Sequence, residues 1–153
     1  MKKIAIILVI FLFGCVSQQN TVTYDFKEII GLYENNKMLF INVTLNGRPA
    51  KLLIDTGASK SLLDINFAEE YGYKCYPLAI DKYIGLGGLH DVYAIANYDI
   101  DEFFTPFLGT DLGEITGYFK DAGVEIVGVL GADFLEMHRA VIDFEKNLMY
   151  KKR

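Results

Sequence analysis

The chain has 153 residues, enough for one domain with a core of its own. Its 20 acidic side chains outnumber the 15 lysines and arginines, which gives a formal net charge of −5, and the basic residues cluster only at Lys151-Lys152-Arg153. An acidic chain of this kind is poorly suited to phosphate backbones, so we expect no nucleic-acid partner. Two cysteines and two histidines argue against a structural zinc site, and we expect neither a metal nor a cofactor.

The first residues have the layout of an export signal. Two lysines precede the apolar residues 4–13, a run too short for a helix that spans a bilayer. The segment Leu12-Phe13-Gly14-Cys15 resembles the lipobox of bacterial lipoproteins, whose cysteine is lipidated and becomes the new N-terminus. We therefore expect a lipoprotein signal peptide over residues 1–14 and a lipid anchor at Cys15. That anchor would hold the protein on a membrane of the cell envelope, facing the periplasm or the exterior. The alternative is an uncleaved anchor, or a plain signal with an incidental cysteine.

The segment after the signal is a short polar tether over residues 15–23, and we place the folded domain at residues 24–153. Cleavage would leave 139 of the 153 residues. The loss of two lysines changes 15 basic side chains to 13 against 20 acidic ones, a formal net charge of −7. Cys75 would then be the remaining thiol. We interpret it as a small, partly buried apolar residue rather than a nucleophile, because no histidine is near it in the sequence.

The first half of the domain is predicted to form strands and one helix. Residues 38–45 alternate near their end, Asn46-Gly47 is a strong hairpin turn, and residues 50–54 form the returning strand. Residues 61–71 have the pattern of a short helix that Gly72 closes.

The second half is predicted to contain more short strands. Residues 82–98 form a glycine-interrupted β segment, and residues 101–123 hold further short strands and turns. After the apolar residues 124–130, residues 132–138 favour a helical turn or two, and residues 140–144 pair with 148–150 in a hairpin. Many short strands with one or two short helices predict a mainly-β barrel.

A short motif at the end of a predicted buried strand carries the chemistry. Asp55-Thr56-Gly57-Ala58-Ser59 follows the apolar strand 51–54 directly. A charged residue that ends a buried strand costs several kcal/mol unless it is paired or functional. The aspartate here opens a Thr-Gly turn, which indicates a functional position.

The segment Leu52-Leu53-Ile54-Asp55-Thr56-Gly57-Ala58-Ser59 resembles the active-site signature of retropepsin-like aspartic proteases. Val129-Leu130-Gly131 is similar to the family's second motif, two hydrophobic residues and a glycine, and residues 131–135 resemble its continuation. The resemblance covers about residues 38–150. It implies a closed acid-protease barrel and an aspartic endopeptidase that acts on a peptide or protein substrate.

The reaction that the resemblance implies needs two carboxylates that share one proton around a water molecule. Asp55 is one such carboxylate, so the resemblance implies a homodimer in which each copy supplies one aspartate. Asp111 and Asp121 are weaker candidates for a partner within the same chain, because neither follows an apolar strand or precedes a hydroxyl residue. For Asp133 and Asp143 we expect surface or capping roles.

The resemblance also assigns roles to the rest of the active-site loop. Gly57 would let the backbone approach the carboxylate, and Thr56 would form hydrogen bonds across the dimer axis. Ala58 differs from those relatives that have serine at this position, and it lacks the hydroxyl that can bond the catalytic carboxylate. Ser59 would bond within the loop or contact the substrate backbone.

A glycine-rich hairpin is the candidate flap that closes over substrate. Gly85, Gly87 and Gly88 resemble its tip, and glycine suits a tip that must move and approach a peptide. The alternative is a tight turn or bulge of the barrel. For His90, next to this hairpin, we expect a surface or flap-side position rather than a pH sensor, and for His138 a capping role at a helix end.

Two rival functions remain open at this point. One is a non-catalytic peptide-binding lipoprotein that keeps the barrel, although such a module has no need of a desolvated aspartate. The other is a protease whose only substrate is itself or a neighbouring protein.

Overall fold

The computed structural model describes residues 24–31, 38–78, 83–85, 88–96 and 107–152. The predicted signal peptide, Cys15 and the tether therefore lie outside the described residues, and so does Gly87. The elements in chain order are β1 (Tyr24–Gly31), β2 (Leu39–Leu45), β3 (Arg48–Ile54), β4 (Leu62–Asp64), α1 (Ile65–Glu70), β5 (Lys74–Pro77), β6 (Tyr83–Gly85), β7 (Gly88–His90), β8 (Tyr93–Ala96), β9 (Leu108–Thr110), α2 (Gly113–Asp121), β10 (Gly128–Leu130), α3 (Ala132–Met137), β11 (Val141–Asp143) and β12 (Leu148–Lys152). The predicted mainly-β architecture is confirmed.

Most of the strands belong to one sheet, in the order β11-β12-β1-β2-β3-β10-β4-β9-β8-β5, and β6 pairs with β7 separately. The hairpin of β2 and β3 was predicted correctly. Asn46 and Gly47 have φ values of 48° and 74°, as a tight hairpin turn with both central residues left-handed requires.

The middle of the sheet is the short buried strand β10, which runs parallel to β3 and antiparallel to β4. Gly128 is needed at its start because a Cβ there would lie 2.3 Å from the carbonyl oxygen of Leu62. Since β3 and β10 run the same way, their carboxyl ends meet, and the residues that follow Ile54 and Leu130 emerge side by side.

The predicted helix over residues 61–71 begins later than expected. Residues 62–64 form β4, whose three residues are all buried between β10 and β9, and α1 starts at Ile65. Asp64 caps the helix, because its Oδ1 accepts hydrogen bonds from the main-chain N–H groups of Asn66 (2.9 Å) and Phe67 (3.5 Å). Pairing within the sheet therefore overrides the helical pattern of this segment.

The largest error of the sequence analysis concerns residues 113–121, which form the helix α2 instead of strands and turns. Its two glycines, Gly113 and Gly117, weaken the local helix signal. The helix is held by packing: Phe119 meets the ring of Phe40 on β2 edge to face, with centroids 5.3 Å apart. The described residues thus contain three short helices rather than one or two.

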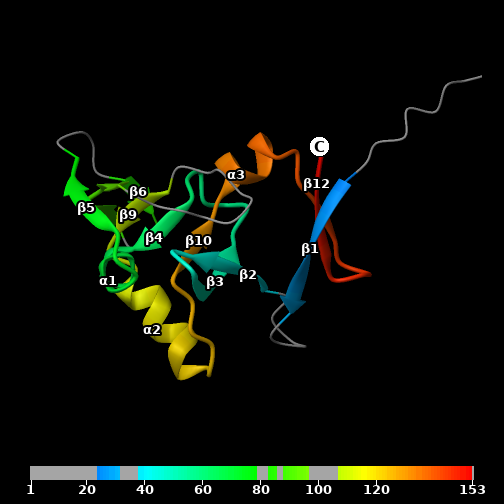
Figure 1. The fold of residues 1–153 in the computed structure, drawn as a ribbon, viewed down its shortest axis with the longest axis horizontal. Helices are drawn as coiled ribbons and strands as arrows, with labels where there is room; N and C mark the ends of the chain where they lie inside the picture. The colour runs from blue at the N-terminus through cyan, green and yellow to red at the C-terminus, as the bar shows by residue number, and fades with distance from the viewer. Residues whose placement is uncertain (1–23, 32–37, 79–82, 86–87, 97–106, 153) are drawn as a thin grey trace, which may run out of the picture.

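The C-terminal elements were predicted correctly as a helix and a hairpin. α3 follows β10 directly, and β11 pairs with β12 across residues 144–147. β1 pairs with β12 through its first part and with β2 through its last part, so it joins the C-terminal hairpin to the rest of the sheet. Figure 1 shows α2 and α3 at opposite ends of β10.

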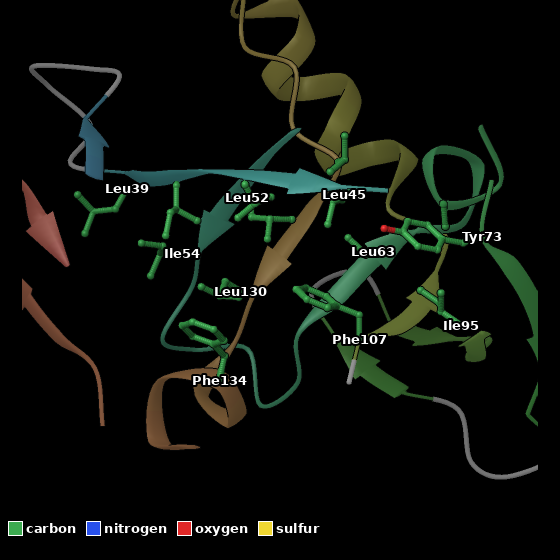
Figure 2. Close-up of a cluster of buried hydrophobic side chains, with 14 of the residues drawn as sticks. Leu39, Leu45, Leu52, Ile54, Leu63, Tyr73, Ile95, Phe107, Leu130 and Phe134 are labelled. Atoms are coloured by element: carbon green, nitrogen blue, oxygen red, sulfur yellow. The ribbon is translucent and has the colours of Figure 1, made fainter. Parts of the chain in front are cut away.

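The main core lies under β2 and β3. Figure 2 shows side chains of these two strands, including Leu52 and Ile54, directed toward Leu130 of β10 and Phe134 of α3. Burial of such side chains is the main stabilising contribution of the fold, at roughly 1.5–3 kcal/mol for each large apolar residue. The core therefore packs directly beneath the strand end that carries Asp55. Among the described helices, none has the length and apolar character needed to cross a membrane.

Candidate functional site

Asp55 lies one residue beyond the end of β3. Its main-chain N–H donates to the carbonyl oxygen of Leu130 at 3.0 Å, so the pairing of β3 with β10 continues to the aspartate itself. The side chain of Asp55 is half-buried. Because its main chain is paired with β10, Asp55 has a fixed backbone position from which its carboxylate projects.

The turn after Asp55 folds back onto its carboxylate. The main-chain N–H of Gly57 donates to Asp55 Oδ1 at 2.8 Å, and that of Ala58 donates to the Asp55 carbonyl oxygen at 3.2 Å. A Cβ on Gly57 would lie 3.2 Å from the same Oδ1, tighter than an ordinary contact. Glycine therefore allows the close approach that the sequence predicted for this position.

The side chains of the loop divide into an exposed and a packed set. Thr56 and Ser59 are exposed, and neither side chain forms a hydrogen bond to another of the described residues. Ala58 is half-buried against an apolar cluster that includes Leu62 and Val129. The hydroxyl groups of the loop thus face solvent, while Ala58 attaches the loop to the apolar cluster.

The second motif supports this loop directly. Val129 and Leu130 are buried, and the main-chain N–H of Ala132 donates to the carbonyl oxygen of Ala58 at 2.7 Å. A Cβ on Gly131 would lie 2.6 Å from the carbonyl carbon and oxygen of Lys60 and 2.8 Å from the Ala58 oxygen. The structure therefore brings the Asp55 loop and Val129-Leu130-Gly131 together, and only glycine fits at their contact.

One side-chain link in this site was missed by the sequence analysis. Ser61 Oγ donates to Asp133 Oδ1 at 2.7 Å and accepts from the main-chain N–H of Gly131 at 3.0 Å. Sequence reasoning placed Ser61 at a helix start and gave Asp133 a surface or capping role. Asp133 does accept from Phe134 in the first turn of α3 (2.8 Å). The pairing with Ser61 has no local sequence signal, because it depends on the neighbouring positions of β4 and β10.

The other aspartates do not join Asp55. Asp111 follows β9 and bonds the N–H of Gly113 at the start of α2, and Asp121 is exposed in the last turn of that helix. β9 runs parallel to β4, which runs antiparallel to β10, so Asp111 lies toward the amino end of β10, whereas Asp55 lies beside its carboxyl end. Figure 1 shows α2, which ends at Asp121, at the amino end as well. Asp143 caps the C-terminal turn, where hydrogen bonds from the main chain and side chain of Lys146 lower the pKa of its carboxyl group.

The candidate flap residues lie on the separate hairpin. Gly85 ends β6 and pairs with Gly88, which begins β7, and Gly87 lies between them outside the described residues. His90 ends β7 and is half-buried. His138 ends α3 as expected, with its ring centroid 4.4 Å from that of Phe134.

Asp55 is therefore the candidate catalytic carboxylate in the described part of the site, because the other carboxylate there, Asp133, accepts hydrogen bonds from Ser61 and Phe134. No other carboxylate forms a hydrogen bond with Asp55 among the residues that the structure describes, and within the same residues no His, Cys, Asp or Glu cluster is arranged to hold a metal ion. One carboxylate can act as an acid or a base but cannot do both at once around a water molecule.

A protein-family model described as "Aspartyl protease" matches residues 41–134, which include both motifs and every strand between them. The chain belongs to the aspartyl protease family. The match extends from β2 to α3 and thus covers the whole frame that holds Asp55.

Curated relatives of this protease-family chain are longer proteins. DNA damage-inducible protein 1 of Candida glabrata is 32% identical over 123 residues, covering 73% of this chain and 25% of the relative. UBA domain-containing protein Mud1 of Schizosaccharomyces pombe is 26% identical over 140 residues, covering 86% of this chain and 40% of the relative. The chain thus spans between a quarter and two fifths of the length of these relatives.

Solved structures show the same fold. EIAV protease complexed with the inhibitor HBY-793 matches with a TM-score of 0.52 at 23% identity, covering 74% of this chain and 99% of that one. A retropepsin-like aspartic protease from Rickettsia conorii matches with a TM-score of 0.51 at 23% identity, covering 85% and 94% of the two chains. The predicted retropepsin-like fold is confirmed.

Proposed function

We propose that this protein is an aspartic endopeptidase whose active site forms between two copies of the chain, each supplying Asp55. The observation that carries the proposal is the geometry of Asp55. It is a half-buried carboxylate at a strand end, with Oδ1 fixed by the N–H of Gly57, in a loop whose other face is exposed. Peptide hydrolysis by this route needs a second carboxylate, and an exposed loop is free to meet its symmetry mate.

The reaction follows from two such carboxylates in contact. Two carboxyl groups about 3 Å apart cannot both ionise, so the pair holds one proton between them. The ionised member takes a proton from a water molecule that attacks the peptide carbonyl carbon, and the protonated member gives its proton to the carbonyl oxygen. The resulting diol then collapses: the newly ionised member takes a proton from one hydroxyl group, the other member protonates the amide nitrogen, and the C–N bond breaks to release an amine and an acid.

The proposed location is a membrane surface of the cell envelope, with the chain held by a lipid on Cys15. The support is the sequence of the export segment, residues 1–15. Confinement to a surface raises the effective concentration of subunits, so a dimer that is weak in solution would still form in place.

The test is cleavage of a peptide library by the purified protein, compared with Asp55→Asn. Asparagine has the same shape and keeps an acceptor for Gly57, so the variant should fold and bind peptides but lose hydrolysis by a factor of ~10²–10⁴. Asp121→Asn is the matched control, because it removes an exposed carboxylate at the other end of β10. Full activity in purified Asp55→Asn would refute the mechanism. Peptide binding without cleavage by the unmodified protein would favour the non-catalytic alternative.

A further inference from the structure

Ser61 is a buried polar side chain next to the proposed catalytic loop. It is 0% exposed, so it cannot touch a substrate. Its hydroxyl group has both an acceptor and a donor partner, because Oγ donates to Asp133 Oδ1 at 2.7 Å and accepts from the N–H of Gly131 at 3.0 Å. A buried hydroxyl with both a donor and an acceptor partner fixes the distance between the segments that it joins.

The segments in question are the Asp55 loop and the start of α3. Four hydrogen bonds tie the loop to residues 130–133, and they are made by every third residue of the loop. Asp55 bonds Leu130, Ala58 bonds Ala132, and Ser61 bonds both Gly131 and Asp133. Only the last of these attachments uses side chains. The outer face of the loop is exposed, so these attachments, together with the packing of Ala58 against the apolar cluster, hold the loop in position.

We propose that Ser61 and Asp133 are positioning residues for Asp55. Their hydrogen bonds, which we call the clamp, join the far end of the active-site loop to the start of α3. The Asp55 carboxylate is thereby held where it can share a proton with Asp55 of the second copy. This inference rests on the proposed function, and it assigns a catalytic consequence to a pair that never contacts the reacting atoms. Loss of the clamp should lower kcat more than it changes KM, because the substrate-facing side chains remain.

Substitutions can remove the Ser61 hydroxyl group and its Asp133 acceptor one at a time, and conservative substitutions can keep each of them. Ser61→Ala removes the hydroxyl, whereas Ser61→Thr keeps it. Asp133→Ala removes the acceptor, whereas Asp133→Asn retains an Oδ1 that can accept from both Ser61 and Phe134. Thr116→Val is the matched control. It removes another buried hydroxyl (9% exposed), which donates to the carbonyl oxygen of Leu112 at the N-cap of α2, toward the other end of β10.

The experiment compares these variants as full-length protein in detergent micelles, with two readouts. The first is kcat and KM, measured at protein concentrations where activity per subunit no longer rises. The second is independent of activity: NMR hydrogen exchange of the Asp55, Gly131 and Ala132 amides, together with the amide shift of Gly57, whose N–H bonds the Asp55 carboxylate.

We expect Ser61→Ala and Asp133→Ala to lower kcat on the order of 10- to 100-fold with little change in KM, as small displacements of a reacting group do. The three amides should exchange faster and the Gly57 amide should shift. Ser61→Thr and Asp133→Asn should restore both readouts toward the unmodified protein. Thr116→Val should leave both unchanged, even where it lowers the unfolding midpoint.

Three results would overturn the proposal. One is a Ser61→Ala protein in which the loop amides and Gly57 match those of Thr116→Val. Another is a loss of kcat that Ser61→Thr does not recover, since that would make side-chain volume rather than the hydroxyl decisive. The third applies if Ser61→Ala does not fold: Asp133→Ala and Asp133→Asn would then show the same kcat and the same amide exchange. An unmodified protein that cleaves no peptide would refute the endopeptidase assignment instead, while the NMR readout would still decide whether the clamp holds Asp55.

Discussion

The main-chain N–H of Asp55 and the carbonyl oxygen of Leu130 are joined by a 3.0 Å hydrogen bond that extends the parallel pairing of β3 and β10 by one residue. This bond explains why two motifs far apart in the sequence act as one structural unit. The first motif carries the carboxylate, and the second supplies the strand end on which it rests.

Assembly should depend on Thr56, whose exposed side chain has no hydrogen-bond partner among the described residues. Thr56→Ala should leave the unfolding free energy of the monomer within about 0.5 kcal/mol. It should raise the dimer dissociation constant roughly 5- to 100-fold, because two symmetry-related hydroxyl groups lose their bonds. The measurement is sedimentation beside activity over a dilution series, with Ser59→Ala as the control from the same loop. A strictly monomeric protein with full, concentration-independent activity would contradict the shared site.

Gly131→Ala should destabilise the protein by about 1–3 kcal/mol and disturb the active-site loop. The added methyl group would lie 2.6 Å from backbone atoms of Lys60, which cannot rotate away as a side-chain end could. Gly117→Ala in α2 is the control, since a Cβ there meets no atom within 4 Å. That substitution should stabilise the helix by about 0.5–1 kcal/mol. Urea unfolding at one fixed protein concentration measures both, and equal effects of the two variants would argue against the close contact.

Asp64→Ala should be among the most destabilising single changes, although Asp64 lies away from the active site. This carboxylate is 1% exposed, and it accepts hydrogen bonds from Asn66 and Phe67 at the start of α1 and from Leu112 before α2 (2.9 Å). We expect the free energy of unfolding to fall by about 2–4 kcal/mol, because α1 loses its cap and the buried N–H group of Leu112 loses its acceptor. Asp64→Asn should cost less, because it keeps the cap. The control is Asp121→Asn, an exposed aspartate in α2, and an Asp64→Ala protein as stable as this control would be inconsistent with the structure.

Cys75 should react slowly with alkylating reagents. Burial, and secondarily the negative charge of Glu69, raises the pKa of the Cys75 thiol. A raised pKa means that less thiolate is present at any given pH, and the thiolate is the reactive form. The alkylation rate of the chain beginning at Tyr24, measured across the alkaline range, should therefore rise at higher pH than for a free cysteine peptide. Glu69→Gln should shift the profile slightly toward lower pH. A thiol more reactive than the free peptide would contradict its interpretation as an inert, partly buried residue.

Cys15→Ser should release the protein from the membrane fraction or block its processing. Our reason is that a bacterial lipoprotein is held by several acyl chains on its first residue, and several chains anchor firmly where one binds only marginally. Fractionation of cells that express either form measures the effect, and Cys75→Ser is the matched control. Continued membrane association after cleavage of the signal would show that the anchor lies elsewhere.

Local sequence signals predicted those parts of the fold whose cause is local. The Asn46-Gly47 turn sets its own backbone conformation and fixes the hairpin of β2 and β3. The helix α3 and the hairpin of β11 and β12 are likewise visible as patterns of neighbouring residues. Asp55 could be singled out because a charged residue at the end of an apolar strand is costly without a function.

Tertiary structure alone decided the features that depend on distant partners. α2 forms despite its glycines because Phe119 packs on Phe40, and residues 62–64 become a strand because β10 and β9 lie on either side. The bond between Ser61 and Asp133 exists only because β10 places the start of α3 beside the end of the active-site loop. Sequence thus predicted which carboxylate is the candidate for catalysis. The packing of β10 between β3 and β4 determined how that carboxylate is held, because hydrogen bonds between distant segments leave no periodic pattern in either one.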